Sequence, residues 1–137
     1  MNSSRIALLA AVAAVVSWTL KAVAIDTAGG LDKSPLEGPL FFTGLLCFVV
    51  AVVAVGVALT RGRPGWVRAV AGVVVAPVLG IGATLAVDGL VGTLRPTDPL
   101  RHWVWAEINL WVAAAAVLGL ALAVRRHGAA SRAAHPA

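Results

Sequence analysis

The sequence has little charge. Of its 137 residues, 12% are Asp, Glu, Lys or Arg, whereas 60% are hydrophobic. Soluble domains average about 25% charged and about 45–50% apolar residues, so this chain has too few charges to cover a surface that faces water. Intrinsic disorder is excluded as well, because disordered segments have low hydrophobicity. The composition therefore predicts an integral membrane protein.

Cysteine is also scarce. The single Cys47 excludes a disulfide-stabilised secreted scaffold and a dithiol redox centre. The histidines, His102, His127 and His135, are scattered and do not combine with Cys and Asp at the spacing of a metal site. Gly29-Gly30 lacks the following Lys-Ser/Thr of a phosphate-binding loop. The sequence thus predicts no catalytic residue, no cofactor and no metal ion, and Cys47 is expected to be a small buried hydrophobic residue.

Four long apolar runs are present, over residues 6–25, 40–59, 66–87 and 103–124. A helix of about 20 apolar residues crosses about 30 Å of hydrocarbon, and it satisfies its own backbone hydrogen bonds where lipid offers none. No run alternates with a period of two as the strands of a membrane barrel do. We therefore predict an all-α integral membrane fold. Residues 1–126 would form one up-down bundle of four transmembrane helices, and residues 127–137 a flexible cytoplasmic tail.

The first run has a second interpretation. Arg5, the apolar residues that follow it and Ala22-Val-Ala24 resemble a signal peptide with an A-x-A cleavage site. However, Lys21 lies close to the proposed cut, and the apolar run continues past the usual length of a signal-peptide core. These features favour an N-terminal helix that stays in the membrane, with cleavage as the alternative.

Basic residues concentrate on one side of the predicted spans. That side carries seven cations and no acid: Arg5, Arg61, Arg63, Arg68, Arg125, Arg126 and Arg132. The other side has a net charge of −2 and carries Lys21, Lys33, Arg95, Arg101, Asp26, Asp32, Glu37, Asp88, Asp98 and Glu107. Because Lys and Arg of short loops collect on the cytoplasmic side, both termini are predicted to be cytoplasmic.

The net charge of +5 thus reflects the direction of insertion and a contact with lipid headgroups. The sequence has no basic stripe with interleaved aromatic residues, so nucleic acid is not an expected partner. The chain is rich in Ala, Val, Gly and Arg and has only two lysines, a composition typical of bacteria with GC-rich genomes. The bacterial cytoplasmic membrane is therefore the expected location.

Aromatic residues fall near the predicted membrane boundaries. Those near the outer boundary are Trp18, Phe41, Phe42, Trp103 and Trp105, and Trp66 is near the inner one. Such positions are typical of residues that anchor helices at the interface. Trp111 lies about two turns inside its span. Stacking on a ligand is the alternative role for the tryptophans.

The two halves of the chain show a weak repeat. Ala24-Ile-Asp26 and Ala86-Val-Asp88 end the odd-numbered spans, and Ser34-Pro-Leu36 and Asp98-Pro-Leu100 precede the even-numbered ones. This pattern predicts two hairpins related by an axis along the membrane normal. Two unrelated hairpins are the alternative, because alanine-rich helices align easily with one another.

Two ionisable residues, Lys21 and Glu107, lie inside the predicted spans, each about 6 Å from the outer boundary. Charges within a span are costly and often functional. Because the first and last helices of an up-down bundle are neighbours, we predict that Lys21 and Glu107 pair or share a polar pocket. In the alternative, both side chains reach separately to the headgroups. With Asp88, Asn109 and Trp111 they make up the candidate polar site, a vestibule open to the outer side.

Small residues recur along three of the spans and end at an ionisable group. These stripes are Ala10, Ala14, Ser17 and Lys21; Gly72, Ala76, Gly80, Thr84 and Asp88; and Glu107, Trp111, Ala115, Gly119 and Ala123. Small residues allow membrane helices to approach closely, so the stripes are predicted packing faces. Pro77 removes one hydrogen bond from the third span and is predicted to kink it.

In size and number of spans the chain resembles small multidrug transporters and small fluoride channels. The transporters carry a glutamate deep in the first span, where this chain has only Lys21 near the outer end, and the signature of the channels is absent. The main hypothesis is a non-enzymatic accessory, structural or regulatory subunit of a membrane assembly. Its partners would be the lipid bilayer and another membrane protein or a second copy. A small oligomeric transporter or channel with a site near Lys21, Asp88 and Glu107 is the alternative, and a membrane-embedded enzyme is the third hypothesis.

Overall fold

The computed structural model describes residues 3–94 and 102–133, with side chains for residues 3–94, 104 and 107–127. All regular structure in these ranges is helical. The elements are α1 (Ser3–Thr27), α2 (Glu37–Leu59), α3 (Gly65–Val70), the π-helix η1 (Ala71–Val75), α4 (Ala76–Leu94) and α5 (His102–Ala133). We refer to α3, η1 and α4 together, residues 65–94, as the α3–α4 rod. Four helices, one of them this rod, are long and apolar enough to cross a membrane, as predicted.

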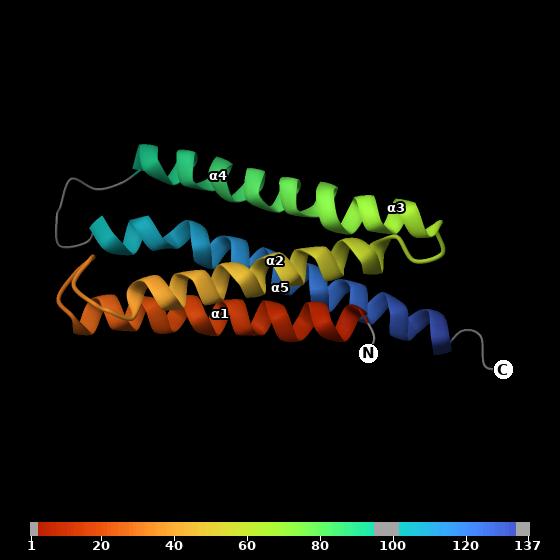
Figure 1. The fold of residues 1–137 in the computed structure, drawn as a ribbon, viewed down its shortest axis with the longest axis horizontal. Helices are drawn as coiled ribbons and strands as arrows, with labels where there is room; N and C mark the ends of the chain where they lie inside the picture. Colours follow the sequence, from red (N-terminus) through yellow and green to blue (C-terminus); the bar gives the residue numbers. More distant parts are fainter. Residues whose placement is uncertain (1–2, 95–101, 134–137) are drawn as a thin grey trace.

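Successive helices run in opposite directions along the bundle (Figure 1). The loop between α1 and α2 reverses the chain through Gly29 and Gly30, whose φ angles are 80° and 136°. The turn between α2 and α3 contains Gly62 with φ 84°. Glycine adopts positive φ without a steric penalty, so these residues permit the short connections of an up-down bundle.

Helices α1, α2 and α5 pack together as a three-helix core. The buried face of α1 follows alternating steps of three and four residues: Ser4, Ala7, Ala11, Ala14, Trp18, Lys21 and Ile25. The same spacing recurs on α2, in Gly44, Phe48, Ala51, Val55 and Ala58. Such spacing is that of helices packed nearly parallel in a left-handed supercoil. The many alanines on these faces let the backbones approach closely.

The predicted packing stripe on α5 is wrong beyond its first turns. Ala115, Gly119 and Ala123 are exposed, and the buried residues of this helix are instead Glu107, Ala113, Ala114, Val117, Ala121 and Val124. Four residues turn a helix by about 400°, so a strict step of four drifts by about 40° at each repeat. After four steps the stripe has rotated away from α1 and α2, whereas the alternation of three and four keeps facing them.

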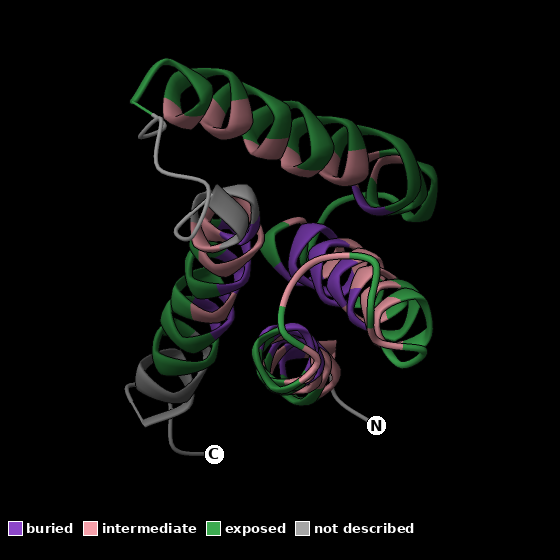
Figure 2. Ribbon diagram, turned by 90° about the vertical axis from the view of Figure 1, so that its left-hand side faces the viewer, coloured by how far each residue is buried: buried purple, intermediate pink, exposed green. Residues whose placement is uncertain are grey.

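The α3–α4 rod lies at the periphery of the bundle. Gly72 is its only buried residue, and the rod packs against α2 and α5 but not against α1. Figure 2 shows it mostly in green and pink, lying across α2 and α5 on the side away from α1. Its contact with α2 is close, because a Cβ atom at Gly72 would lie 2.6 Å from Val57 Cγ2 and one at Gly56 would lie 2.9 Å from the Ala71 carbonyl oxygen.

The predicted stripe on the rod does face the bundle. Gly72 is buried, and Ala76, Gly80, Thr84 and Asp88 are all half-buried. A stripe with steps of four turns gradually around the helix axis. On the rod it still faces the bundle, because the neighbour of the rod changes from α2 to α5 along its length. Gly72 and Gly80 lie against α2, and Asp88 contacts α5.

Pro77 was predicted to kink the third span, and the structure has a π-turn directly before it. Over Ala71–Val75 the hydrogen bonds widen, and the N–H of Ala76 is bonded to the carbonyl of Ala71. Proline lacks an N–H, and its ring crowds the carbonyl four residues earlier, that of Val73. Single π-turns inside α-helices accommodate such disruptions.

The two predicted hairpins are packed unequally. Helices α1 and α2 both belong to the core, whereas the α3–α4 rod is largely exposed beside α5. Asp98-Pro-Leu100, one of the segments on which the repeat was proposed, lies outside the described residues. At the C-terminal end, α5 continues past Val124 to Ala133 and thus includes much of the segment expected to form a tail.

Candidate functional site

Lys21 and Glu107 form a buried ion pair between α1 and α5. The Lys21 Nζ atom donates a hydrogen bond to Glu107 Oε1 at 2.5 Å. Lys21 is 6% exposed and Glu107 is 5% exposed, so neither side chain reaches out to the headgroups. The predicted contact between these two residues is therefore confirmed. Their opposite signs and equal depths in the two spans were sufficient to predict it.

Helix α2 completes the surroundings of the Lys21 ammonium. Glu37 Oε1 lies 3.9 Å from Lys21 Nζ, and the centre of the Phe41 ring lies 5.5 Å from the same atom. A cation at this distance from an aromatic ring is attracted by the ring's quadrupole. One ammonium thus joins three helices at one end of the core. Glu37 was not predicted as part of the site, although it lies four residues before Phe41 and so shares its helix face.

Glu107 has an unused acceptor. Its Oε2 atom is buried and has no hydrogen-bond partner among the described residues. A buried polar atom without a partner costs about 1–3 kcal/mol, and more when it is charged. The pair therefore carries a residual electrostatic cost that a packed apolar contact would not have.

A polar hollow of about 350 Å³ lies beside the ammonium. It is lined by Lys21, Asp32, Ser34, Glu37, Gly38 and Phe41. The loop between α1 and α2 forms its rim, where the backbone N–H of Asp32 donates to Glu37 Oε2 at 2.9 Å. This bond holds Glu37 toward the loop and fixes the side chain that also faces Lys21.

Asp88 and Asn109 form a second contact, between α4 and α5. Asn109 Nδ2 donates to Asp88 Oδ1 at 3.3 Å. Glu107 and Asn109 are two residues apart, which places them about 200° apart around α5. Glu107 accordingly contacts α1 and Asn109 contacts α4. The structure thus divides the predicted polar site into two pairs, and neither Asp88 nor Asn109 lines the hollow beside Lys21. Trp111 is half-buried and packs against the core.

Trp18 is a core residue, so its predicted role as an interface anchor is wrong. It is 1% exposed, and its indole Nε1 donates to the Phe41 carbonyl at 3.4 Å. Gly44 makes room for the ring, because a Cβ atom there would lie 2.3 Å from Trp18 Nε1. The helix face that Trp18 shares with Ala14 and Lys21 was the signal for its burial.

The other predicted anchors differ in their exposure. Trp66 is 72% exposed and Phe42 is 67% exposed, as residues that face the bilayer boundary would be. Phe41 is half-buried and faces Lys21. The side chains of Trp103 and Trp105 lie outside the described part of the chain.

Comparisons with protein-family models, curated proteins and solved structures found no match to this chain. Among the described residues, no group of three or more His, Cys, Asp or Glu side chains is arranged to hold a metal ion. The two polar pairs connect helices. Lys21 connects α1 to α2 and α5, and Asp88 connects α4 to α5.

Proposed function

We propose that this protein is a four-helix membrane subunit without catalytic activity, which acts by binding another transmembrane helix. Its four long apolar helices support insertion in a bilayer. Arg63, Arg68, Arg125 and Arg126 lie at the end of the bundle where α2 and the described part of α5 both end (Figure 1). By the preference of basic residues for the cytoplasmic side, this end and both termini lie in the cytoplasm of a bacterial cell.

The observation that carries the proposal is the outer face of the α3–α4 rod. Gly82, Ala86, Gly89 and Thr93 follow one another at steps of four, three and four and are all exposed. A Cβ atom at Gly82 or Gly89 would meet nothing within 4 Å. The close approach to α2 uses other glycines, so these small residues are not explained by packing within the chain. Small residues at this spacing are typical of contacts between transmembrane helices.

The alternative, a small oligomeric transporter or channel, has one observation in its favour. The unpartnered Oε2 of Glu107 is a group that a transported cation or proton could use. However, Lys21 and Glu107 are in direct contact and nearly inaccessible, and the hollow beside them is confined to one end of the bundle. A tight, buried pair in the core supports a subunit better than a permeation path.

The test uses the full chain purified in mild detergent, with the mass of the complex measured by light scattering and its components identified by mass spectrometry. We expect an assembly larger than one chain, with a second copy or one defined membrane protein. Gly89→Leu should dissociate it, because leucine would block close approach. Gly92→Leu is the matched control, since Gly92 is also exposed and unobstructed but lies about 80° around the helix from Gly82.

Two outcomes contradict the proposal. In one, the wild-type chain is a stable monomer that purifies alone. In the other, Gly89→Leu and Gly92→Leu leave the assembly equally intact, which would mean that this face of the rod does not bind the partner.

A further inference from the structure

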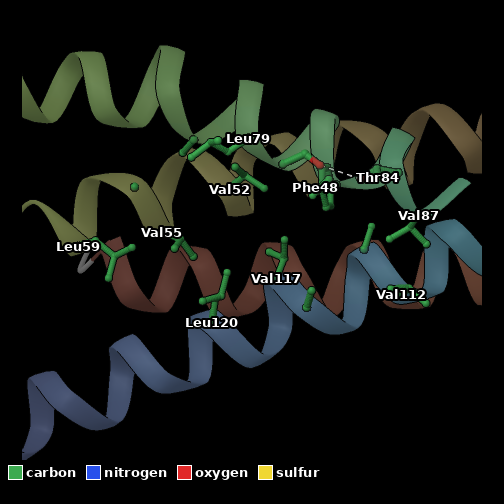
Figure 3. Close-up of a pocket in the computed structure, with 16 residues that line it drawn as sticks. Phe48, Val52, Val55, Leu59, Leu79, Thr84, Val87, Val112, Val117 and Leu120 are labelled. Carbon is green, nitrogen blue, oxygen red and sulfur yellow. Dashed lines mark hydrogen bonds between the residues drawn. The ribbon is translucent and has the colours of Figure 1, made fainter. Parts of the chain in front are cut away.

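An apolar cavity of about 300 Å³ lies between α2, α4 and α5 (Figure 3). Its floor consists of buried residues of the core, Phe48, Val52 and Val55 from α2 and Val117 from α5. Leu79 is among the residues that line it from α4. The cavity lies beside the rod where its contacts pass from α2, at Gly72 and Gly80, to α5, at Asp88.

The described side chains that line the cavity offer water no free hydrogen-bonding group. Among the described residues that line it, Thr84 alone has a polar side chain, and its hydroxyl donates to the Gly80 carbonyl of its own helix at 2.9 Å. Water needs two to four polar partners to occupy a cavity, and apolar cavities stay dry. An empty cavity would forfeit the dispersion contacts of its walls. In a bilayer, the hydrocarbon chain of a lipid can enter the cavity and restore these dispersion contacts.

The volume of the cavity matches that of part of a lipid acyl chain. An apolar cavity of about 150 Å³ holds one benzene molecule, so about 300 Å³ holds roughly a dozen carbon atoms. The cavity is therefore large enough for much of an acyl chain.

One end of the cavity leads to basic residues. Leu59, the last residue of α2, lines the cavity and is directly followed by the turn that contains Arg63. Arg68 lies on α3, which follows this turn, and both arginines are exposed. The described acids lie far along the chain from this turn, at the other end of the bundle. A phosphate at this end would thus meet cations and no carboxylate, and guanidinium groups bind phosphate through paired hydrogen bonds.

We propose that the cavity between α2, α4 and α5 is part of a binding site for one anionic phospholipid. An acyl chain of the lipid lies in the cavity, and the phosphate of the lipid binds to Arg63 and Arg68. A glycerophospholipid has this layout, since its headgroup lies at the interface and its chains extend toward the middle of the bilayer. Basic pockets between helices at the cytoplasmic side are known to select anionic headgroups. The bound chain also fills the gap that the crossing of the rod leaves open.

The test measures lipid binding to the purified, delipidated full chain by native mass spectrometry, with phosphatidylglycerol and phosphatidylcholine as probes. We expect one phosphatidylglycerol per chain, bound at least tenfold more tightly than phosphatidylcholine. Ala116→Leu should weaken this binding about tenfold, because Ala116 lines the cavity and leucine would fill it. Ala115→Leu is the matched control, because Ala115 is also exposed on α5 but does not line the cavity.

The headgroup is tested with Arg63→Gln combined with Arg68→Gln. We expect this variant to lose the preference for phosphatidylglycerol and to keep weak binding of both lipids. Arg5→Gln, an exposed arginine on α1, is the control and should retain the preference.

The proposal is overturned if Ala116→Leu and Ala115→Leu bind phosphatidylglycerol equally, or if the wild-type chain binds both lipids equally. It is also overturned if Ala116→Leu changes the oligomeric state and leaves lipid binding unchanged. The lipid site does not rest on the proposed subunit function. Gly89→Leu tests that function separately and should leave the bound lipid in place.

Discussion

Helix α1 of the three-helix core and the α3–α4 rod are about equally apolar but are packed in different ways. Mean hydropathy is 2.1 in the most apolar part of α1 and 2.3 in the rod, yet 39% of the first segment is buried and 6% of the second. The difference lies in the spacing of the small residues. Steps of three and four keep one face of α1 and of α2 turned toward the same neighbours, whereas steps of four in the rod drift around its axis from α2 to α5. Hydropathy therefore identifies a span, and the spacing of its small residues decides whether the span is central.

Polar contacts follow the same division. The core has a buried ion pair with both partners nearly inaccessible, and the rod is attached to α5 by a longer, half-buried hydrogen bond between Asn109 and Asp88. Disruption of the core should therefore cost more than detachment of the rod. The following variants test this order, with the free energy of unfolding measured by titration with SDS in mixed micelles.

The largest effect is expected at the ion pair. Lys21→Met should lower the free energy of unfolding by about 3–5 kcal/mol, because it leaves Glu107 charged and buried without its partner. The double variant Lys21→Met with Glu107→Gln should recover at least about 2 kcal/mol, since it removes both charges. If the double variant is as unstable as the sum of the two single variants, the pair is not coupled.

Trp18→Ala should cost about 3 kcal/mol, because it leaves a cavity between α1 and α2 at the side chain that packs on Gly44. The matched control is Trp66→Ala at the start of the rod, where the side chain is 72% exposed and the expected change is within about 0.5 kcal/mol. Equal losses for the two variants would mean that Trp18 is not in the core.

The smallest effect is expected where the rod meets α2. Gly72→Leu should cost about 1–3 kcal/mol, because any side chain at this position collides with Val57. Cross-linking between cysteines introduced at Val52 and Gly80, which face each other across this contact, should fall, while the far-UV circular dichroism stays unchanged. Gly92→Leu, with nothing within 4 Å, is the control. A global loss of structure in Gly72→Leu would show that the rod is part of the core.

Much of this arrangement could be predicted from the chain alone. The four spans followed from the length of the apolar runs, and the Lys21–Glu107 contact from two opposite charges at one depth. The stripe on the rod was also predicted. Trp18 was missed because tryptophans near a boundary are typical anchors, and only Gly44 on the next helix makes room for its ring.

The sequence by itself determined the number of long apolar helices and the separation of charge along the chain, because each depends on local composition. Only the tertiary structure decided which helix is peripheral, that Glu37 faces Lys21, and that a cavity lies beneath the rod. The physical reason is that a membrane helix is apolar on every side, so hydrophobicity does not indicate which side faces its neighbours. That choice depends on how side chains of two helices fit together, and the partner surface exists only in the folded chain.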